Sequence, residues 1–144
     1  MGTKEKTIIT VGVEVDAPVG LVWEFWTSPQ HIMKWNHASD DWHTTSAENE
    51  LHVGGKFSSR MEAKNGSEGF DFGGIYKIVI INKKLEYTLD DGRNVRVIFF
   101  ALGNKTKIAE TFEAESINPV EMQRAGWQAI LNNFKKYAEE NKNI

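Results

Sequence analysis

The sequence contains no cysteine, so disulfide bonds, thiol catalysis and thiolate metal sites are excluded. Basic residues do not accumulate either, because 17 Lys and Arg are set against 20 Asp and Glu, for a net charge of -3. Nucleic-acid binders usually concentrate Lys and Arg on one surface, so we expect no nucleic-acid partner. Apolar runs such as Ile78–Ile81 are far shorter than the roughly 20 residues that span a bilayer. We therefore expect no integral membrane segment.

The N-terminal segment Met1–Lys6 is charged and lacks the apolar core of a signal peptide. We therefore expect a cytoplasmic protein. The length of 144 residues suits one hydrophobic core, since single domains typically hold roughly 100–150 residues. No linker, repeat or low-complexity segment interrupts the chain, which predicts a single domain over residues 1–144.

The first third of the chain combines a strand with two short helices. Apolar residues alternate with polar ones over Ile8–Val15, which is typical of a half-buried strand. Pro18 suits the first turn of a helix, and apolar residues follow it at helical spacing. Ser28–Pro29 should end this helix and begin a second one, which runs to Trp35.

The middle of the chain predicts a series of antiparallel strands. We expect a polar loop after Trp35, a bulge at Gly73–Gly74, and type I′ turns at Asn65–Gly66 and Asp91–Gly92, where positive φ is tolerated. The predicted strands are Leu51–Val53, Lys56–Lys64, Phe70–Ile81, Leu85–Leu89, Val95–Leu102 and Ile108–Ala114.

The C-terminal segment changes to helical periodicity. Asn118 is predicted as the N-cap of a long helix over Pro119–Glu140, with an apolar stripe that includes Trp127 and Phe134. Strands followed by a helix argue for an α+β fold, in which the helix covers one face of the sheet. A sheet of about six or seven strands must twist and curl. A single helix laid across it leaves a gap lined by the inward apolar residues, and this gap is the predicted cavity.

Glu110 is the candidate with the strongest chemistry. If Ile108 and Phe112 face inward, alternation carries the Glu110 side chain inward as well. A carboxyl group beneath a helix must be paired, protonated or facing a wet cavity, so Glu110 is a candidate ligand-orienting group. A strand end that turns it to solvent, or pairing with Arg60 or Arg96, is the alternative. Tyr87 could supply a hydroxyl to the same space, or simply pack in the core.

Aromatic residues are abundant, with five Trp and eight Phe. They could form a cavity wall for flat ligands or fill the core of a small domain. Trp35 and Trp42 flank the polar loop and are the candidates for a cavity mouth, whereas Trp127 is expected to pack. His31 and His37 are two of four histidines at irregular spacing, which predicts no metal site; the others are His43 and His52. No Walker, G-x-S-x-G or dinucleotide glycine pattern is present, and no cofactor or catalytic residue is predicted.

Several motifs, in this order along the chain, resemble one family. They are Ala17–Pro18 with Val22–Trp23, Thr27–Pro29, Val53–Phe57 (V-G-G-K-F), Gly69–Phe72, Asp91–Arg93, Thr111–Glu113 and the helix Gln123–Phe134. Together they make the chain similar to the AHSA-type branch of the START-like (SRPBCC) superfamily, named for homologues of an activator of the heat-shock-protein chaperone ATPase. The resemblance covers roughly Ile8 to Tyr137.

The resemblance implies a helix-grip fold with a hydrophobic cavity between the long helix and the sheet. It implies a partner that is a hydrophobic or amphipathic small molecule: a lipid, a flavonoid-like or a polyketide-like compound. A cyclase or dehydratase with Glu110 and Tyr87 as acid–base residues, and a chaperone-interacting protein linked to the stress response, are alternatives. A homodimer partner is also left open. The candidate cavity residues are Trp35, Trp42, Phe57, Ser59, Met61, Phe72, Tyr87, Val97, Phe99, Glu110, Phe112, Met122, Gly126 and Ile130.

Overall fold

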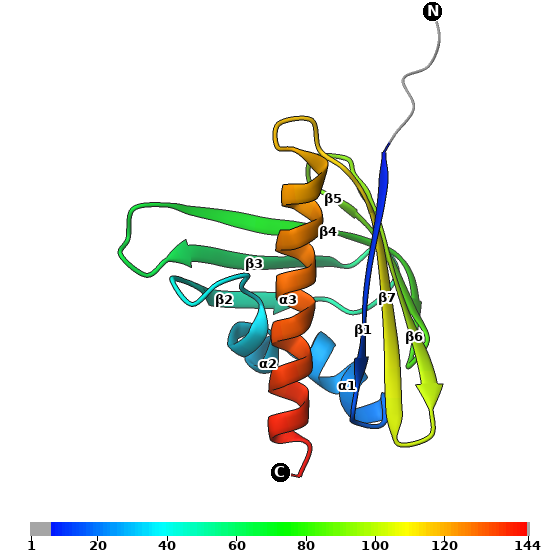
Figure 1. The fold of residues 1–144 in the computed structure, drawn as a ribbon. Helices are drawn as coiled ribbons and strands as arrows, with labels where there is room; N and C mark the ends of the chain where they lie inside the picture. Colours follow the sequence, from blue (N-terminus) through cyan, green and yellow to red (C-terminus); the bar gives the residue numbers. More distant parts are fainter. Residues whose placement is uncertain (1–6, 144) are drawn as a thin grey trace, which may run out of the picture.

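A seven-stranded antiparallel sheet and a long C-terminal helix dominate the computed structural model, which describes residues 7–143 (Figure 1). The charged segment 1–6, which argued against a signal peptide, lies outside the described residues. The strands are β1 (Ile8–Val15), β2 (Trp42–Asn49), β3 (Lys56–Ala63), β4 (Gly69–Ile80), β5 (Lys84–Leu89), β6 (Asn94–Leu102) and β7 (Lys105–Glu113). The helices are α1 (Val19–Thr27), α2 (Pro29–Trp35) and α3 (Val120–Asn141).

The sheet curls around α3. Its strand order is β1-β7-β6-β5-β4-β3-β2, so all neighbours except β1 and β7 are consecutive in the chain. In Figure 1, β1, β6 and β7 run roughly along α3, whereas β2, β3 and β4 cross behind it. This change of direction is the accumulated twist of a many-stranded sheet. The predicted α+β helix-grip architecture is confirmed.

The core lies between the concave face of the sheet and the apolar face of α3. Ile9 and Val15 of β1 have no exposed surface, as alternation over this strand predicts. Leu131, Phe134 and Ala138 of α3 are also wholly buried. Their spacing of three and four residues places them on one face of the helix. The predicted apolar stripe is therefore the surface that holds α3 on the sheet.

Polar side chains of α3 fasten the helix to the edge strand β1. These hydrogen bonds run from Gln128 Nε2 to Gly12 O (3.0 Å), from Lys135 Nζ to Glu14 O (2.7 Å) and from Asp16 N to Glu139 Oε2 (2.8 Å). The three backbone partners lie at alternate positions, so they all point away from β7, the only strand that β1 pairs with.

The polar segment before residue 50 is a strand and not a loop. β2 pairs antiparallel with β3 and forms the outer edge of the sheet. Thr44 alone is fully buried along it, so β2 has almost no apolar alternation. The strand predicted at Leu51–Val53 is wrong, because this segment is a turn in which His52 N donates to Glu50 O and Gly55 N donates to His52 O.

Two turn types and one bulge also differ from the predictions. Asn65 and Asp91 do not adopt positive φ, whereas the glycines that follow them do, so neither turn is type I′. Another common hairpin loop consists of a type I turn followed by a single glycine in the left-handed region. The bulge of β4 lies between Tyr76 and Ile78, not at Gly73–Gly74.

The start of α3 differs by one residue from the prediction. The helix begins at Val120, and Pro119 occupies the N-cap position without a side-chain cap, so Asn118 is not the N-cap. Gln123 supplies the anchor instead: its Nε2 donates to Asn118 O and Glu115 O, and its Oε1 accepts from Glu115 N. Within residues 7–143, no helix is long and apolar enough to cross a membrane.

Candidate functional site

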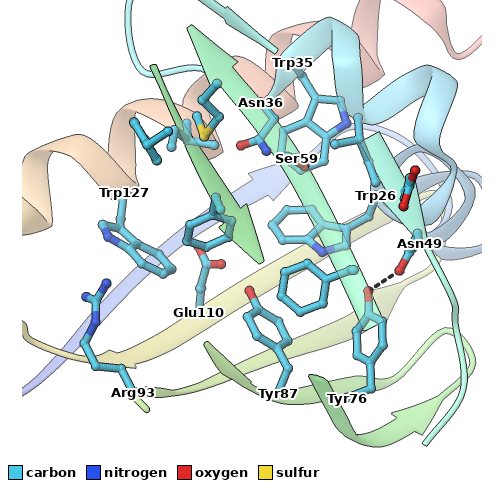
Figure 2. Close-up of a pocket in the computed structure, with 17 residues that line it drawn as sticks. Trp26, Trp35, Asn36, Asn49, Ser59, Tyr76, Tyr87, Arg93, Glu110 and Trp127 are labelled. Carbon is cyan, nitrogen blue, oxygen red and sulfur yellow. Dashed lines mark hydrogen bonds between the residues drawn. The ribbon is translucent and has the colours of Figure 1, made fainter. Parts of the chain in front are cut away.

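A cavity of about 300 Å³ lies between α3, the two short helices and the concave face of the sheet. Strands β2 to β5 and β7 supply most of its wall, and the turn before β6 supplies Arg93. The lining residues are Trp26, Ile32, Trp35, Asn36, Glu48, Asn49, Phe57, Ser59, Met61, Phe70, Phe72, Tyr76, Tyr87, Arg93, Glu110, Trp127 and Ile130. Figure 2 shows these side chains around one common space.

Aromatic rings form most of the wall. Trp26 and Trp35 come from α1 and α2 and lie against each other, with ring centroids 4.9 Å apart. Phe57 of β3 meets Tyr87 of β5 edge to face at 4.8 Å. Tyr76 of β4 is directly opposite Tyr87 in the strand pairing, so both rings must lie on the same face of the sheet. Such a wall favours flat, apolar ligands.

Glu110 is the one buried carboxyl group in this wall. It lies on β7 between Ile108 and Phe112, which are also buried, so alternation places its side chain inward as predicted. Its exposed fraction is 6%. Arg60 instead pairs with Glu62 and Asp71, and Arg96 is exposed.

Burial alone controls the protonation of Glu110. No hydrogen bond or ion pair joins its carboxyl group to another residue within 7–143, and burial raises its pKa to about 8. The Glu110 side chain is therefore mainly in the acid form at neutral pH. An acid form carries an O–H donor as well as a carbonyl acceptor.

Tyr87 brings a second polar group to the same space. Its ring is almost fully buried, and within the described chain no residue accepts or donates a hydrogen bond at its hydroxyl. Burial raises the pKa of Tyr87, and the nearby Glu110 raises it further. Tyr76 differs, because its hydroxyl donates to Asn49 Oδ1 at 2.7 Å (Figure 2). Asn49 Nδ2 in turn donates to Thr27 O at 2.6 Å.

The cavity reaches the surface. Glu48 and Phe70 line it and are both exposed, which places a mouth near β2 and the start of β4. Arg93 lies on the Trp127 side of the view in Figure 2. Its Nε donates to Asp91 Oδ2 at 2.8 Å, so its charge already has a partner. The inner part of the cavity therefore holds no free cation among the described residues.

The structure brings together eight of the fourteen candidate residues as cavity lining. They are Trp35, Phe57, Ser59, Met61, Phe72, Tyr87, Glu110 and Ile130. Contact with a ligand remains a prediction for these residues. Their common feature is an inward position on a strand, or a place on the helix faces that meet the cavity.

The other six candidates do not line the cavity. Val97, Phe99 and Phe112 face inward but are covered: Trp23 and Trp26 pack on Phe99 at 5.4 Å and 5.7 Å. The Trp127 ring stacks on Phe112 at 3.8 Å and seals it from the space above. The remaining three candidates lie elsewhere. Trp42 packs against the exposed Phe70, and Met122 near the start of α3 is 61% exposed. Gly126 precedes Trp127 in α3 and does not line the cavity.

Some lining residues were missed by the sequence analysis. Trp127 was expected only to pack, yet it both stacks on Phe112 and lines the cavity. Asn49 belongs to the unrecognised strand β2, so its inward position had no basis in the sequence. Tyr76 could have been found, because it lies on the same face of its strand as Phe72 until the bulge that follows.

The histidines do not assemble into a metal site. Across residues 7–143, no group of three or more His, Asp and Glu side chains is placed to hold a metal ion. His31 Nδ1 instead shares a hydrogen bond of 2.6 Å with the Tyr137 hydroxyl. His37 is partly buried, and burial lowers its pKa.

Known proteins share this fold and much of this sequence. Residues 16–139 match the model of the family described as Activator of Hsp90 ATPase homolog 1-like protein. The solution structure of the AHSA1-like protein from Aeromonas hydrophila is 42% identical, with a TM-score of 0.84, over 92% of this chain and 93% of that chain. A solution structure from Cytophaga hutchinsonii is 51% identical, with a TM-score of 0.80, over 94% of each chain.

The fold extends to more distant proteins. A crystal structure from Chromobacterium violaceum is 20% identical, with a TM-score of 0.83, over 92% of this chain and 98% of that chain. The comparison with curated proteins found no match. The family model covers all elements from α1 to most of α3, which are the elements that surround the cavity. This chain therefore belongs to the Activator of Hsp90 ATPase homolog 1-like family.

Proposed function

We propose that this protein binds a hydrophobic or amphipathic small molecule in the cavity beneath α3, such as a lipid, a flavonoid-like or a polyketide-like compound. The cavity volume of about 300 Å³ lies at the lower end of the range for ligand pockets. Its wall is mainly aromatic and aliphatic, with a small number of polar groups, which is the usual composition of a small-molecule site.

The observation that carries the proposal is the pair of polar groups without protein partners, Glu110 and Tyr87. Both are almost fully buried and both face the cavity. Among residues 7–143, only His37 Nδ1 is sealed from solvent without a hydrogen-bond partner, so the Glu110 carboxyl and the Tyr87 hydroxyl are open to the cavity and can be reached from it. A ligand that enters the cavity would hydrogen-bond to both groups.

Filling the cavity tests the proposal. Ser59 is buried on β3 and lines the cavity, whereas its neighbour Ser58 faces the other side of the sheet. Ser59→Trp should weaken binding of palmitic acid or acetylnaphthalene at least tenfold, and the matched variant Ser58→Trp should bind as the wild type does. Quenching of tryptophan emission and calorimetry would measure the affinity. If neither compound binds the wild type, or if both variants behave alike, the proposal is wrong.

A chaperone interaction is the second candidate, supported by the family and by exposed apolar residues away from the cavity. Ile80 and Ile81 at the end of β4 lie near the end of the sheet where β6 exposes Phe100 and Leu102. Exposed apolar groups of this kind often contact partner proteins. If this surface acts on a chaperone, the variant Phe100→Ser should lose stimulation of an Hsp90 ATPase while it retains ligand binding.

Catalysis of a cyclase or dehydratase reaction is supported only by the shared cavity position of Glu110 and Tyr87. Native mass spectrometry of a bound polyketide-like compound over time would distinguish holding from conversion, since a catalyst changes the mass or the structure of the bound species.

A further inference from the structure

The two unpartnered polar groups of the cavity lie on the two strands that flank β6. Glu110 is on β7 and Tyr87 is on β5, with β6 between them. On β6 the intervening inward residues are Val95 and Val97, which pair with residues of both neighbouring strands. These valines are buried and do not line the cavity, whereas Glu110 on one side of β6 and Tyr87 on the other side both do. Figure 2 shows both oxygen-bearing ends directed into the same space.

Both groups carry a proton at neutral pH. Burial raises the pKa of Glu110 to about 8, and no nearby cation contributes to hold it ionised. Burial also raises the pKa of the Tyr87 hydroxyl. Two other ionisable side chains that line the cavity already have partners, because Tyr76 donates to Asn49 and Arg93 pairs with Asp91. Glu48 is exposed at the mouth. The lining residues from α3, Trp127 and Ile130, are not ionisable.

We propose that Glu110 in its acid form and Tyr87 donate two hydrogen bonds to one acceptor oxygen of the ligand, so that the cavity selects neutral, planar aromatic compounds with a carbonyl group. A carbonyl oxygen has two lone pairs and can accept from both donors. A protonated carboxyl and a tyrosine in an apolar site are an established way to bind such an oxygen in other proteins. This inference rests on the proposed ligand-binding function and adds the chemical class of the ligand.

An aromatic cavity with an ionised carboxylate would instead suit a cationic amine. The two possibilities differ in their pH dependence. A ligand that accepts a hydrogen bond from the acid form of Glu110 binds best below about pH 8. It loses affinity as the carboxyl ionises, because the carboxylate oxygen then has no proton to donate and repels the acceptor oxygen of the ligand. An amine would show the opposite dependence.

Four naphthalene compounds of similar size test the selection: acetylnaphthalene, ethylnaphthalene, naphthoate and naphthylmethylamine. The ketone should bind about tenfold more tightly than the ethyl compound near neutral pH, as expected from two net hydrogen bonds of modest strength. Naphthoate and the amine should bind more weakly than the ketone. Equal affinity of the ketone and the ethyl compound would overturn this inference and leave cavity binding intact. An amine that binds best, increasingly so at high pH, would also overturn it. If none of the four binds, this inference is wrong, and the palmitic acid measurement then decides whether the cavity binds ligands at all.

Variants assign the effect to the two side chains. Tyr87→Phe should weaken ketone binding about fivefold and leave ethylnaphthalene unchanged. The matched control Tyr137→Phe removes a hydroxyl that bonds to His31 outside the cavity, so it should not change the affinity of either compound. Glu110→Gln keeps an N–H donor, so it should retain most of the ketone affinity and lose the pH dependence. Circular dichroism would establish that each variant is folded.

One measurement needs no variant. A ligand that binds the acid form must raise the pKa of that group further, because binding and protonation are linked. In carbon-detected NMR titrations, acetylnaphthalene should therefore move the Glu110 pKa above its ligand-free value of about 8. Ketone binding that leaves this pKa unchanged, or lowers it, would refute the proposed hydrogen bond.

Discussion

Replacing Glu110 by glutamine should change how the stability of the protein depends on pH. The pKa of this carboxyl is about 8 in the folded chain, against an ordinary value of 4.5 for a glutamate in water. Because the folded state binds the proton more tightly, the contribution of Glu110 to stability is fully present below about pH 4.5 and is lost as the pH rises towards about 8. At about 1.4 kcal/mol for each tenfold change in proton affinity, the total loss is roughly 5 kcal/mol.

Urea unfolding followed by tryptophan emission measures this effect across pH. Between about pH 5 and about pH 8.5, the free energy of unfolding of the wild type should fall by about 4 kcal/mol relative to Glu110→Gln, whose amide stays neutral. The control Glu121→Gln changes an exposed carboxyl at the start of α3 and should follow the wild-type curve. Parallel curves for wild type and Glu110→Gln would refute the reasoning and mean that solvent inside the cavity hydrates the carboxylate.

Three further changes test the packing. Phe134→Ala should cost about 3–5 kcal/mol, more than Trp127→Ala, because Phe134 is wholly buried whereas Trp127 already borders an open cavity; denaturant unfolding would rank them. Gln123→Ala should cost about 1–3 kcal/mol and Asn118→Ala much less, since Gln123 rather than Asn118 fastens the start of α3; thermal unfolding would show any reversal. Gly74→Ala should lower the melting temperature sharply, because its Cβ would clash with the Thr88 carbonyl oxygen of β5, and an unchanged melting temperature would contradict this contact.

The fold was largely predictable because most elements carry their own periodicity. Alternation over β1 and the apolar stripe of α3 each identify an element and its buried face. β2 has no such signal, because Thr44 is the one buried residue on this edge strand. This segment is a strand because it pairs with β3. The turn after β2 was mistaken for a strand because Leu51 and Val53 are apolar, although backbone bonds within the turn decide its shape.

The candidate site was predictable only in part, for a geometrical reason. Alternation tells which side chains face inward, and the two inward residues Glu110 and Tyr87 both line the cavity, while their contact with a ligand stays a prediction. It cannot tell which inward residues a helix covers: Phe112 lies under Trp127, and Phe99 lies under α1. How far α3 and α1 reach across the sheet depends on the curl of all seven strands, which no local pattern records.

The hydrogen bonds that fasten α3 to β1 also affect how this sheet meets other chains. An edge strand with free N–H and C=O groups invites a further strand and hence aggregation. Along β1 and just after it, Gly12 O, Glu14 O and Asp16 N already bond to side chains of α3, so an incoming strand cannot use these three backbone atoms. The opposite edge, β2, has an irregular register between Thr44 and Ser46, and such bulges also disfavour added strands. The sheet that curls around α3 thus has a feature at each edge that disfavours the addition of further strands.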